Sequence, residues 1–182
     1  SNFGNLLLFL NISLSIMIIY KGYKSFLATD SIIPKIIYQL SILQSTLIII
    51  CFLTLISAFL VSDFSLITVY QNSHSLKPTF YKIAGTWGNH EGSLLLWLLV
   101  LALFILIFLV KTKNQPIKYR ILTLVFQQII IVGFFVFLIK TSNPFNHIYP
   151  IPTEGLGLNP ILQDPALAIH PPILYLGYVG TS

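Results

Sequence analysis

The stretch SLLLWLLVLALFILIFLV, residues 93–110, is apolar throughout and carries no charged side chain. An α-helix rises about 1.5 Å per residue, so a helix of this length is about 27 Å long and matches the hydrocarbon thickness of a bilayer. Three other stretches are as long and apolar, and a fifth begins close to the end of the sequence. The predicted fold is all-α, a polytopic transmembrane helical bundle with four full spans and the start of a fifth. The spans are expected at about 3–20, 38–61, 93–110 and 121–139, with the start of the fifth at 167–182, in a single membrane domain over residues 1–182.

The composition excludes a soluble protein. Of the 182 residues, 55% are hydrophobic and 8% are charged, whereas about a quarter of the residues of a soluble domain are charged. The net charge of +5 does not indicate nucleic-acid binding, because the basic residues are spread through the connections between apolar stretches. The single cysteine, Cys51, lies within an apolar stretch, so no internal disulfide can form. The lipid bilayer is therefore a predicted partner, and nucleic acid is not.

The basic residues also predict the orientation in the membrane. Seven lie between the first and second spans or between the third and fourth, and three lie on the other side. Because cytoplasmic and matrix loops carry an excess of Lys and Arg, the seven are expected on the cytoplasmic or matrix side. The amino terminus and all four histidines then face the opposite side. The seven are Lys21, Lys24, Lys35, Lys111, Lys113, Lys118 and Arg120, and the three are Lys77, Lys82 and Lys140.

The residue usage predicts a compartment as well. Ile, Phe, Leu, Lys and Asn are abundant while Arg is nearly absent, a bias typical of an AT-rich genome such as that of an organelle. The predicted location is the mitochondrial inner membrane, with the bacterial cytoplasmic membrane as the alternative. In both cases the protein is multi-pass, with its amino terminus and His170 on the intermembrane or periplasmic side.

The stretch NPILQDPALAIHPPILYLGYVG, residues 159–180, contains a helix start followed by a pair of prolines. Asp164 can cap free N–H groups, and Pro165 fits the first helical position. Pro171 and Pro172 remove two backbone donors, so we expect the helix to break at His170. An imidazole held at such a bend can bind a metal centre. The alternative is an interfacial histidine that bonds water or backbone.

A second stretch, TWGNHEGSLLLW at residues 86–97, places His90 and Glu91 directly before the third span. A carboxylate that enters a membrane is costly unless it is paired or hydrated, so Glu91 is a candidate partner for a loop group or a lining of a ligand cleft. The alternative is an ordinary helix start, with Glu91 at the positive end of the helix dipole and Trp87 and Trp97 in the aromatic belt. The residues alone leave both interpretations open.

Two polar connections lie on the predicted outer side. Residues 62–92 alternate polar and aromatic side chains, which is typical of a segment along the membrane interface. Residues 140–164 are rich in Asn, Pro and Gly and are expected to be irregular. His74 and His147 are expected to be solvated residues of these connections, and His90 to be structural.

The strings FLVSDFSLITVYQNS, TWGNHEGSLLLW, TSNPF and LNPILQDPALAIHPPILYLGYVG occur in this order along the chain. In these strings and their spacing the sequence resembles the amino-terminal part of the CcmF family of cytochrome c maturation proteins, within the haem-handling superfamily of c-type cytochrome biogenesis. The likeness runs across essentially all 182 residues. Three of the strings exceed ten residues, a length that chance similarity between apolar helices would not produce.

The resemblance implies a subunit of the haem lyase that attaches haem covalently to apocytochrome c. It implies that His170, the histidine of the HPP motif, is an axial ligand of haem iron, with the haem being b-type and in transit. The implied partners are other cytochrome c maturation membrane proteins, apocytochrome c, and a polypeptide that carries the carboxy-terminal part. Candidates for shaping the site are Trp87, His90, Glu91, Pro171, Pro172 and Tyr175.

The family's tryptophan-rich external segment is expected to follow Ser182, on a continuation of the chain or on a separate polypeptide. Gly177 and Gly180 would permit a neighbouring helix to approach closely. Whether the chain itself has haem lyase activity stays open at this point, because that segment is not in the sequence. The alternative function is a non-catalytic structural subunit of a larger respiratory-chain assembly, a reduced relative of CcmF.

Overall fold

The computed structural model describes residues 2–27 and 32–181, and these residues are arranged as helices and connections without a sheet. Within these described ranges four helices are long and apolar enough to cross a membrane, so the predicted all-α transmembrane class is confirmed and the chain is a multi-pass membrane protein. The long helices are α1 (Asn2–Leu27), α2 (Ile32–Leu60), α5 (His90–Lys111) and α6 (Ile117–Thr141), and the shorter elements are α3 (Ile67–Asn72), α4 (Thr79–Gly85), the 3-10 helix η1 (Pro160–Gln163) and α7 (Pro165–Gly180).

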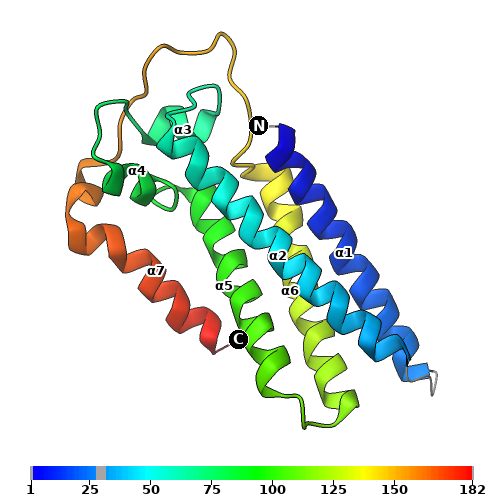
Figure 1. Ribbon diagram of the computed structural model, residues 1–182. Coiled ribbons are helices and arrows are strands. Elements are labelled where there is room, and N and C mark those ends of the chain that lie inside the picture. Colours follow the sequence, from blue (N-terminus) through cyan, green and yellow to red (C-terminus); the bar gives the residue numbers. More distant parts are fainter. Residues whose placement is uncertain (1, 28–31, 182) are drawn as a thin grey trace.

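The four long helices pack side by side, and α7 lies outside them (Figure 1). Helix α1 packs against α2 and α6, and α5 packs against α2, α6 and α7. Among the described residues the main neighbour of α7 is therefore one long helix, α5, with smaller contacts to the short α4 and η1. The start of a fifth membrane segment predicted at 167–182 corresponds to α7, although Ser182 lies outside the described residues.

At the end that carries most basic residues, the helices extend beyond the apolar stretches. The first span was expected to end near residue 20 and the second to begin near 38, whereas α1 continues to Leu27 and α2 begins at Ile32. Lys21 and Lys24 therefore lie in helix, and Lys24 Nζ lies 5.0 Å from the ring centroid of Tyr20. The length of the apolar stretch determines how much of a helix lies in the hydrocarbon of the bilayer. The helix can continue beyond it, because long basic side chains reach the lipid headgroups.

Polar side chains are buried between α1 and α2. Gln44 of α2 donates from its amide nitrogen to the hydroxyl of Ser15 and, at 3.4 Å, to the carbonyl oxygen of Asn11. Asn11 donates to the carbonyl oxygen of Leu7 at 2.8 Å, and all three polar side chains are fully buried. Hydrogen bonds between helices hold α1 and α2 together where apolar contacts alone provide little preference over lipid.

Arg120 at the start of α6 is buried, although the sequence placed it among the basic residues of a loop. Its guanidinium carbon lies 4.2 Å from the ring centroid of Tyr38, and its Nη2 donates to the carbonyl oxygen of Leu109 at 3.3 Å. A cation at the last turn of α5 is stabilised by the helix dipole and by the aromatic face. Arg120 therefore joins α2, α5 and α6 at this end of the bundle.

The two polar connections lie together at the other end, beside the start of α1 (Figure 1). Residues 142–164 are irregular apart from η1, as predicted, and residues 61–89 contain α3 and α4. The connections exchange backbone hydrogen bonds, from Leu156 N to Tyr70 O at 2.8 Å and from Ile67 N to Asn146 O at 3.0 Å. Asn143 donates to Asn5 of α1 at 2.8 Å. One end of the bundle thus carries a structured polar cap.

Candidate functional site

Helix α7 begins where the sequence predicts. Asp164 is its N-cap, and the carboxylate accepts hydrogen bonds from Ala166 N at 2.9 Å and Leu167 N at 3.1 Å. Pro165 occupies the first helical position, where its missing N–H leaves no hydrogen bond unmade. The chain therefore enters α7 at a defined residue and a defined angle.

The predicted break of this helix at His170 is wrong, because α7 is one helix from Pro165 to Gly180 with both prolines inside it (Figure 1). Pro172 cannot donate to the carbonyl oxygen four residues earlier, that of Ala168. The structure supplies another donor: Trp87 Nε1 donates to Ala168 O at 2.8 Å. The indole replaces one of the two backbone donors that the proline pair removes, and α7 continues through the pair.

Aromatic side chains hold α7 on α5. Trp97 of α5 lies between two rings, with its centroid 5.1 Å from that of Phe134 on α6 and 5.5 Å from that of Tyr175 on α7. Trp97 and Trp87 are half-buried contacts between elements of the protein, which differs from the aromatic-belt interpretation. Tyr175, a candidate for shaping the site, thus has a packing role at the α5–α7 contact.

The two glycines near the end of α7 face different surroundings. A Cβ atom on Gly180 would lie 3.2 Å from Phe104, so this glycine permits close approach to α5 within the chain. A Cβ atom on Gly177 would meet nothing within 4 Å, so Gly177 lies on the open face. The expected close approach of a neighbour therefore applies to α5 at Gly180, and only Gly177 is available to another helix.

His170 lies on the open face of α7 and is exposed. It lines a mainly apolar groove of about 630 Å³ together with residues from the following turns of the same helix. Pro171 and Pro172 are half-buried toward the rest of the protein, so the helix is seated on one side and presents the imidazole on the other. Among the described residues no group of three His, Cys, Asp or Glu side chains could hold a metal ion. The other residues of the groove are Ile173, Leu174, Gly177, Tyr178 and Thr181.

The stretch TWGNHEG forms the tight turn that starts α5. Asn89 is the N-cap, and its Oδ1 accepts from Gly92 N at 2.7 Å. A Cβ atom on Gly92 would lie 1.6 Å from the carbonyl oxygen of Thr86, so only glycine fits there. Glu91 lies half-buried in the first turn, where the helix dipole favours a negative charge. Much of this motif is therefore explained by the helix start and by Trp87.

Within the described part of the chain, no hydrogen bond, ring contact or shared groove joins His90 to His170. His90 is exposed at the first position of α5, and its ring centroid lies 6.0 Å from that of Phe137 on α6. His170 lies on the face of α7 that points away from its packing partners. These two site candidates belong to different surfaces, the α5–α6 seam and the open face of α7.

A carboxylate joins the two outer connections. Glu154 accepts from Ser75 N and from Gly155 N, each at 2.9 Å, and also from the hydroxyl of Ser75. The hydrogen bond from the Ser75 side chain, followed by the two backbone bonds, lowers the pKa of Glu154 from 4.5 to about 2. His74 Nδ1 lies 3.8 Å from Glu154 Oε1. His74 thus belongs to this contact and is only partly solvated.

His147 is only partly solvated as well. It pairs with Leu66 in an isolated antiparallel bridge, and its half-buried ring stacks on Tyr149 at a centroid distance of 6.2 Å. Sequence reasoning also missed Asn89 as a cap and Trp97 as an interhelical contact. An Asn three residues before Gly92 and an apolar run is a helix-start signal that could have identified Asn89. No local signal identifies the partners of Trp97, because they come from two distant helices.

Comparison with known proteins places this arrangement in a family. The family model described as "Cytochrome C assembly protein" matches residues 87–182, which include the helix-start motif from Trp87 onward, α5, α6 and α7. The chain belongs to the cytochrome c assembly protein family. The match confirms the predicted membership of a cytochrome c maturation family.

Relatives and a solved structure agree with the family match. The chain is 52% identical to the cytochrome c-type biogenesis protein CycK of Rhizobium meliloti (strain 1021) over 136 residues, 75% of this chain and 20% of that protein. It is 45% identical to CcmF of Escherichia coli (strain K12) over 132 residues, 72% of this chain and 20% of that protein. A solved structure named "Cytochrome c Heme Lyase CcmF" matches with a TM-score of 0.80 and 26% identity, over 97% of this chain and 28% of that one. The chain thus spans about a fifth of the length of the curated relatives it matches.

Proposed function

We propose that this chain is the amino-terminal part of a cytochrome c haem lyase, and that His170 takes the iron of the substrate haem as an axial ligand. The observation that carries the proposal is the position of His170, exposed on the open face of a helix whose other face is fixed to α5. Neutral imidazole is a common axial ligand of haem iron. Support comes from the family match and from the name of the solved structure that the chain resembles.

The groove at His170 fits one face of a haem. Its lining is mainly apolar, with Ile173 and Leu174 one turn below the imidazole. An apolar surface beside an imidazole suits a porphyrin ring, because the ring is apolar and the iron at its centre needs the nitrogen ligand. All described residues that line the groove belong to α7 or directly follow it, so we propose that the opposite wall and a second ligand come from elsewhere. The proposed partner for that wall is a continuation of the chain or a separate polypeptide with the tryptophan-rich segment.

The orientation of His170 depends on Trp87. The hydrogen bond from Trp87 Nε1 to Ala168 O fixes the turn of α7 that precedes His170. Tyr175 and Trp97 fix the turn that follows it. We therefore assign Trp87 and Tyr175 a positioning role, and apocytochrome c and other cytochrome c maturation membrane proteins are the proposed partners at the open face.

The test is His170→Ala in the full-length protein, with haem content measured by absorption spectroscopy after purification. We expect haem retention to fall by at least about ten-fold, since removal of a ligand costs no less than removal of the groups that orient it. Because His170 is exposed, the substitution leaves no cavity. His170→Gly with added imidazole should recover haem binding, which a purely structural role would not allow.

His74→Ala and His147→Ala are the matched controls, since both histidines lie in the polar cap away from α7. Their haem content should equal that of the natural protein. Equal haem content in the His170→Ala protein would contradict the ligand assignment. It would favour the alternative of a structural subunit in a respiratory-chain assembly, and co-purification of respiratory subunits would then identify it.

We propose that the polar cap and His170 face the intermembrane space of mitochondria, or the periplasm in a bacterium. The seven-to-three distribution of basic residues supports this orientation. The relatives compared above are bacterial, and the mitochondrial location rests on residue usage alone. A cysteine introduced at Lys113 should react with a membrane-impermeant reagent only from the inner side. Reaction of that cysteine from the outer side would overturn the orientation.

A further inference from the structure

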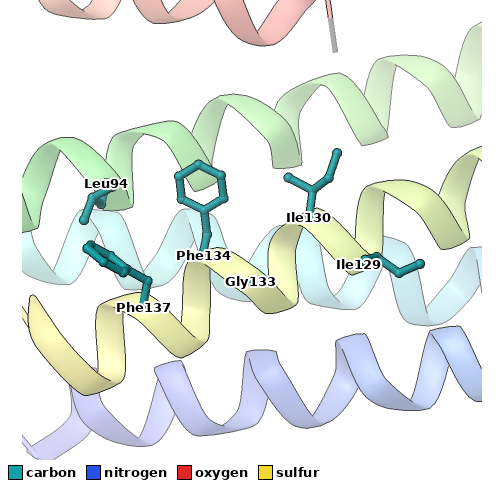
Figure 2. Close-up of a pocket in the computed structure, with 6 residues that line it drawn as sticks. All are labelled: Leu94, Ile129, Ile130, Gly133, Phe134 and Phe137. Carbon is teal, nitrogen blue, oxygen red and sulfur yellow. The ribbon is translucent and has the colours of Figure 1, made fainter.

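The seam between α5 and α6 opens into an apolar groove on the surface of the bundle (Figure 2). The groove has a volume of about 340 Å³. Gly133 lies in its middle, and a Cβ atom there would meet nothing within 4 Å, so the absent side chain helps to form the gap. Figure 2 shows Phe134 projecting from α6 toward α5, and Phe137 lying beside Leu94. The lining residues are Leu94, Ile129, Ile130, Gly133, Phe134 and Phe137.

The groove lies at hydrocarbon depth. It belongs to two helices that are apolar enough to span the membrane. From Ile129 to Phe137 the α6 axis advances by about 12 Å, which corresponds to much of one leaflet. Its lining carries no charged or hydrogen-bonding side chain. The occupant over this length must therefore be apolar, as an acyl chain is.

The outer end of the groove carries cationic and hydrogen-bonding groups. His90 precedes Leu94 by four residues, and Lys140 follows Phe137 by three, so each lies on the groove side of its helix. His90 contacts the ring of Phe137, with centroids 6.0 Å apart, and both polar side chains are exposed. The one acidic residue in that turn of α5, Glu91, is half-buried. The mouth of the groove thus offers a Lys cation and an imidazole to an anion at headgroup level.

We propose that this groove retains an anionic phospholipid of the outer leaflet, with one acyl chain along Gly133 and the phosphate between His90 and Lys140. The apolar lining matches the chain, and the cationic mouth matches the headgroup. A transmembrane helix from another polypeptide would fill the apolar part but would leave Lys140 without an anion. The inference concerns the α5–α6 seam and does not depend on haem binding at α7.

The experiment uses the full-length protein in phosphatidylcholine nanodiscs with a trace of phosphatidylglycerol that is spin-labelled on its acyl chain. We expect a motionally restricted component in the electron paramagnetic resonance spectrum. All lipid at the protein surface contributes to this component, so Gly133→Leu, which fills the groove, should remove only the excess of restricted phosphatidylglycerol over restricted phosphatidylcholine. Space for the new side chain exists. Gly177→Leu is the matched control, because its Cβ also meets open space but on α7. An unchanged excess of restricted phosphatidylglycerol in the Gly133→Leu protein would overturn the proposal.

The headgroup is tested by Lys140→Gln and His90→Gln. The preference for spin-labelled phosphatidylglycerol over the matching phosphatidylcholine should fall by about five-fold for Lys140→Gln, the effect of one cationic side chain at a charged membrane surface. The effect of His90→Gln should be smaller. Lys82→Gln is the control, since Lys82 is bonded to Ser62 in the polar cap. Equal retention of the two lipids by the natural protein would contradict the anionic headgroup.

The alternative occupant is tested by cross-linking. Cys51 is buried, so a cysteine introduced at Ile130 can carry a photoreactive group into the groove. Cross-links to lipid would support the proposal. Cross-links to a polypeptide would assign the groove to a protein partner and overturn it.

Discussion

Helices α5 and α7 begin alike but differ in how they pack against the rest of the protein. Each starts with a polar side chain that caps the first turn, Asn89 for α5 and Asp164 for α7. Helix α5 then buries nine of its residues against α2, α6 and α7, whereas α7 buries two, Ala168 and Val179. Both are apolar, and the sequence predicts both as membrane segments. The difference shows that the number of packed neighbours decides which of two similar helices becomes the centre of the bundle and which presents an open face.

The largest effect is expected at the start of α5, from Gly92→Ala. The new Cβ would lie 1.6 Å from the carbonyl oxygen of Thr86, so the turn or the helix must move. We expect a loss of about 3 kcal/mol or more in the free energy of unfolding, at the upper end of the range for overpacking. Unfolding in detergent, followed by tryptophan fluorescence, measures it. An unchanged unfolding midpoint would show that the turn at Thr86 can move at little cost, and that the start of α5 is packed less tightly than its buried residues indicate.

Trp87→Phe tests the hydrogen bond that lets α7 pass through its proline pair. The ring remains, but the donor to Ala168 O is lost, at a cost of about 1–3 kcal/mol for a buried acceptor left without a partner. Hydrogen–deuterium exchange of α7 amides should accelerate while that of α5 amides stays the same. Trp97→Phe is the control, because it keeps a ring between Phe134 and Tyr175. Equal exchange in α7 after Trp87→Phe would mean that the indole is not what sustains the helix.

Gly177→Ala is the counterpart of Gly92→Ala on the open helix. Because nothing lies within 4 Å of the new Cβ, the higher helix propensity of alanine should stabilise α7 with no steric clash to offset it. We expect a gain of up to about 1 kcal/mol in the same unfolding experiment. A destabilised protein would show that the face of α7 at Gly177 is already covered.

The smallest effect is expected from pH, in the polar cap that leads into α7. The pKa of Glu154 is lowered from 4.5 to about 2 in the folded protein, so the folded state binds fewer protons than the unfolded state between these values. The stability from this carboxylate is complete above about pH 4.5 and is lost as the pH falls toward 2. The midpoint of thermal unfolding should fall over that range, and Glu154→Gln should remove this part of the pH dependence. Because the group is partly solvated, the change should be modest.

The sequence alone determined the class of the protein, the four spans and the start of α7. These features depend on local chemistry: an uninterrupted apolar stretch must hydrogen-bond its own backbone in lipid, and Asp164 before Pro165 caps a helix wherever it lies. The family, too, followed from contiguous strings, which the match over residues 87–182 confirms. The role of His170 stays a prediction, since an exposed imidazole on α7 fits a ligand without proving one.

Only the tertiary structure decided how the helices use these features. The proline pair predicts a break, yet α7 is continuous, and Trp87, some eighty residues earlier in the chain, replaces one of the two lost backbone donors. Gly177 and Gly180 look alike in sequence, but Phe104 of α5 lies against one and open space against the other. His90 and His170 were grouped as site candidates, and the packing places them on separate surfaces. The physical reason is common to all three. Whether a residue has a hydrogen-bond donor, a packed neighbour or open space beside it depends on residues far away along the chain, which the local sequence does not identify.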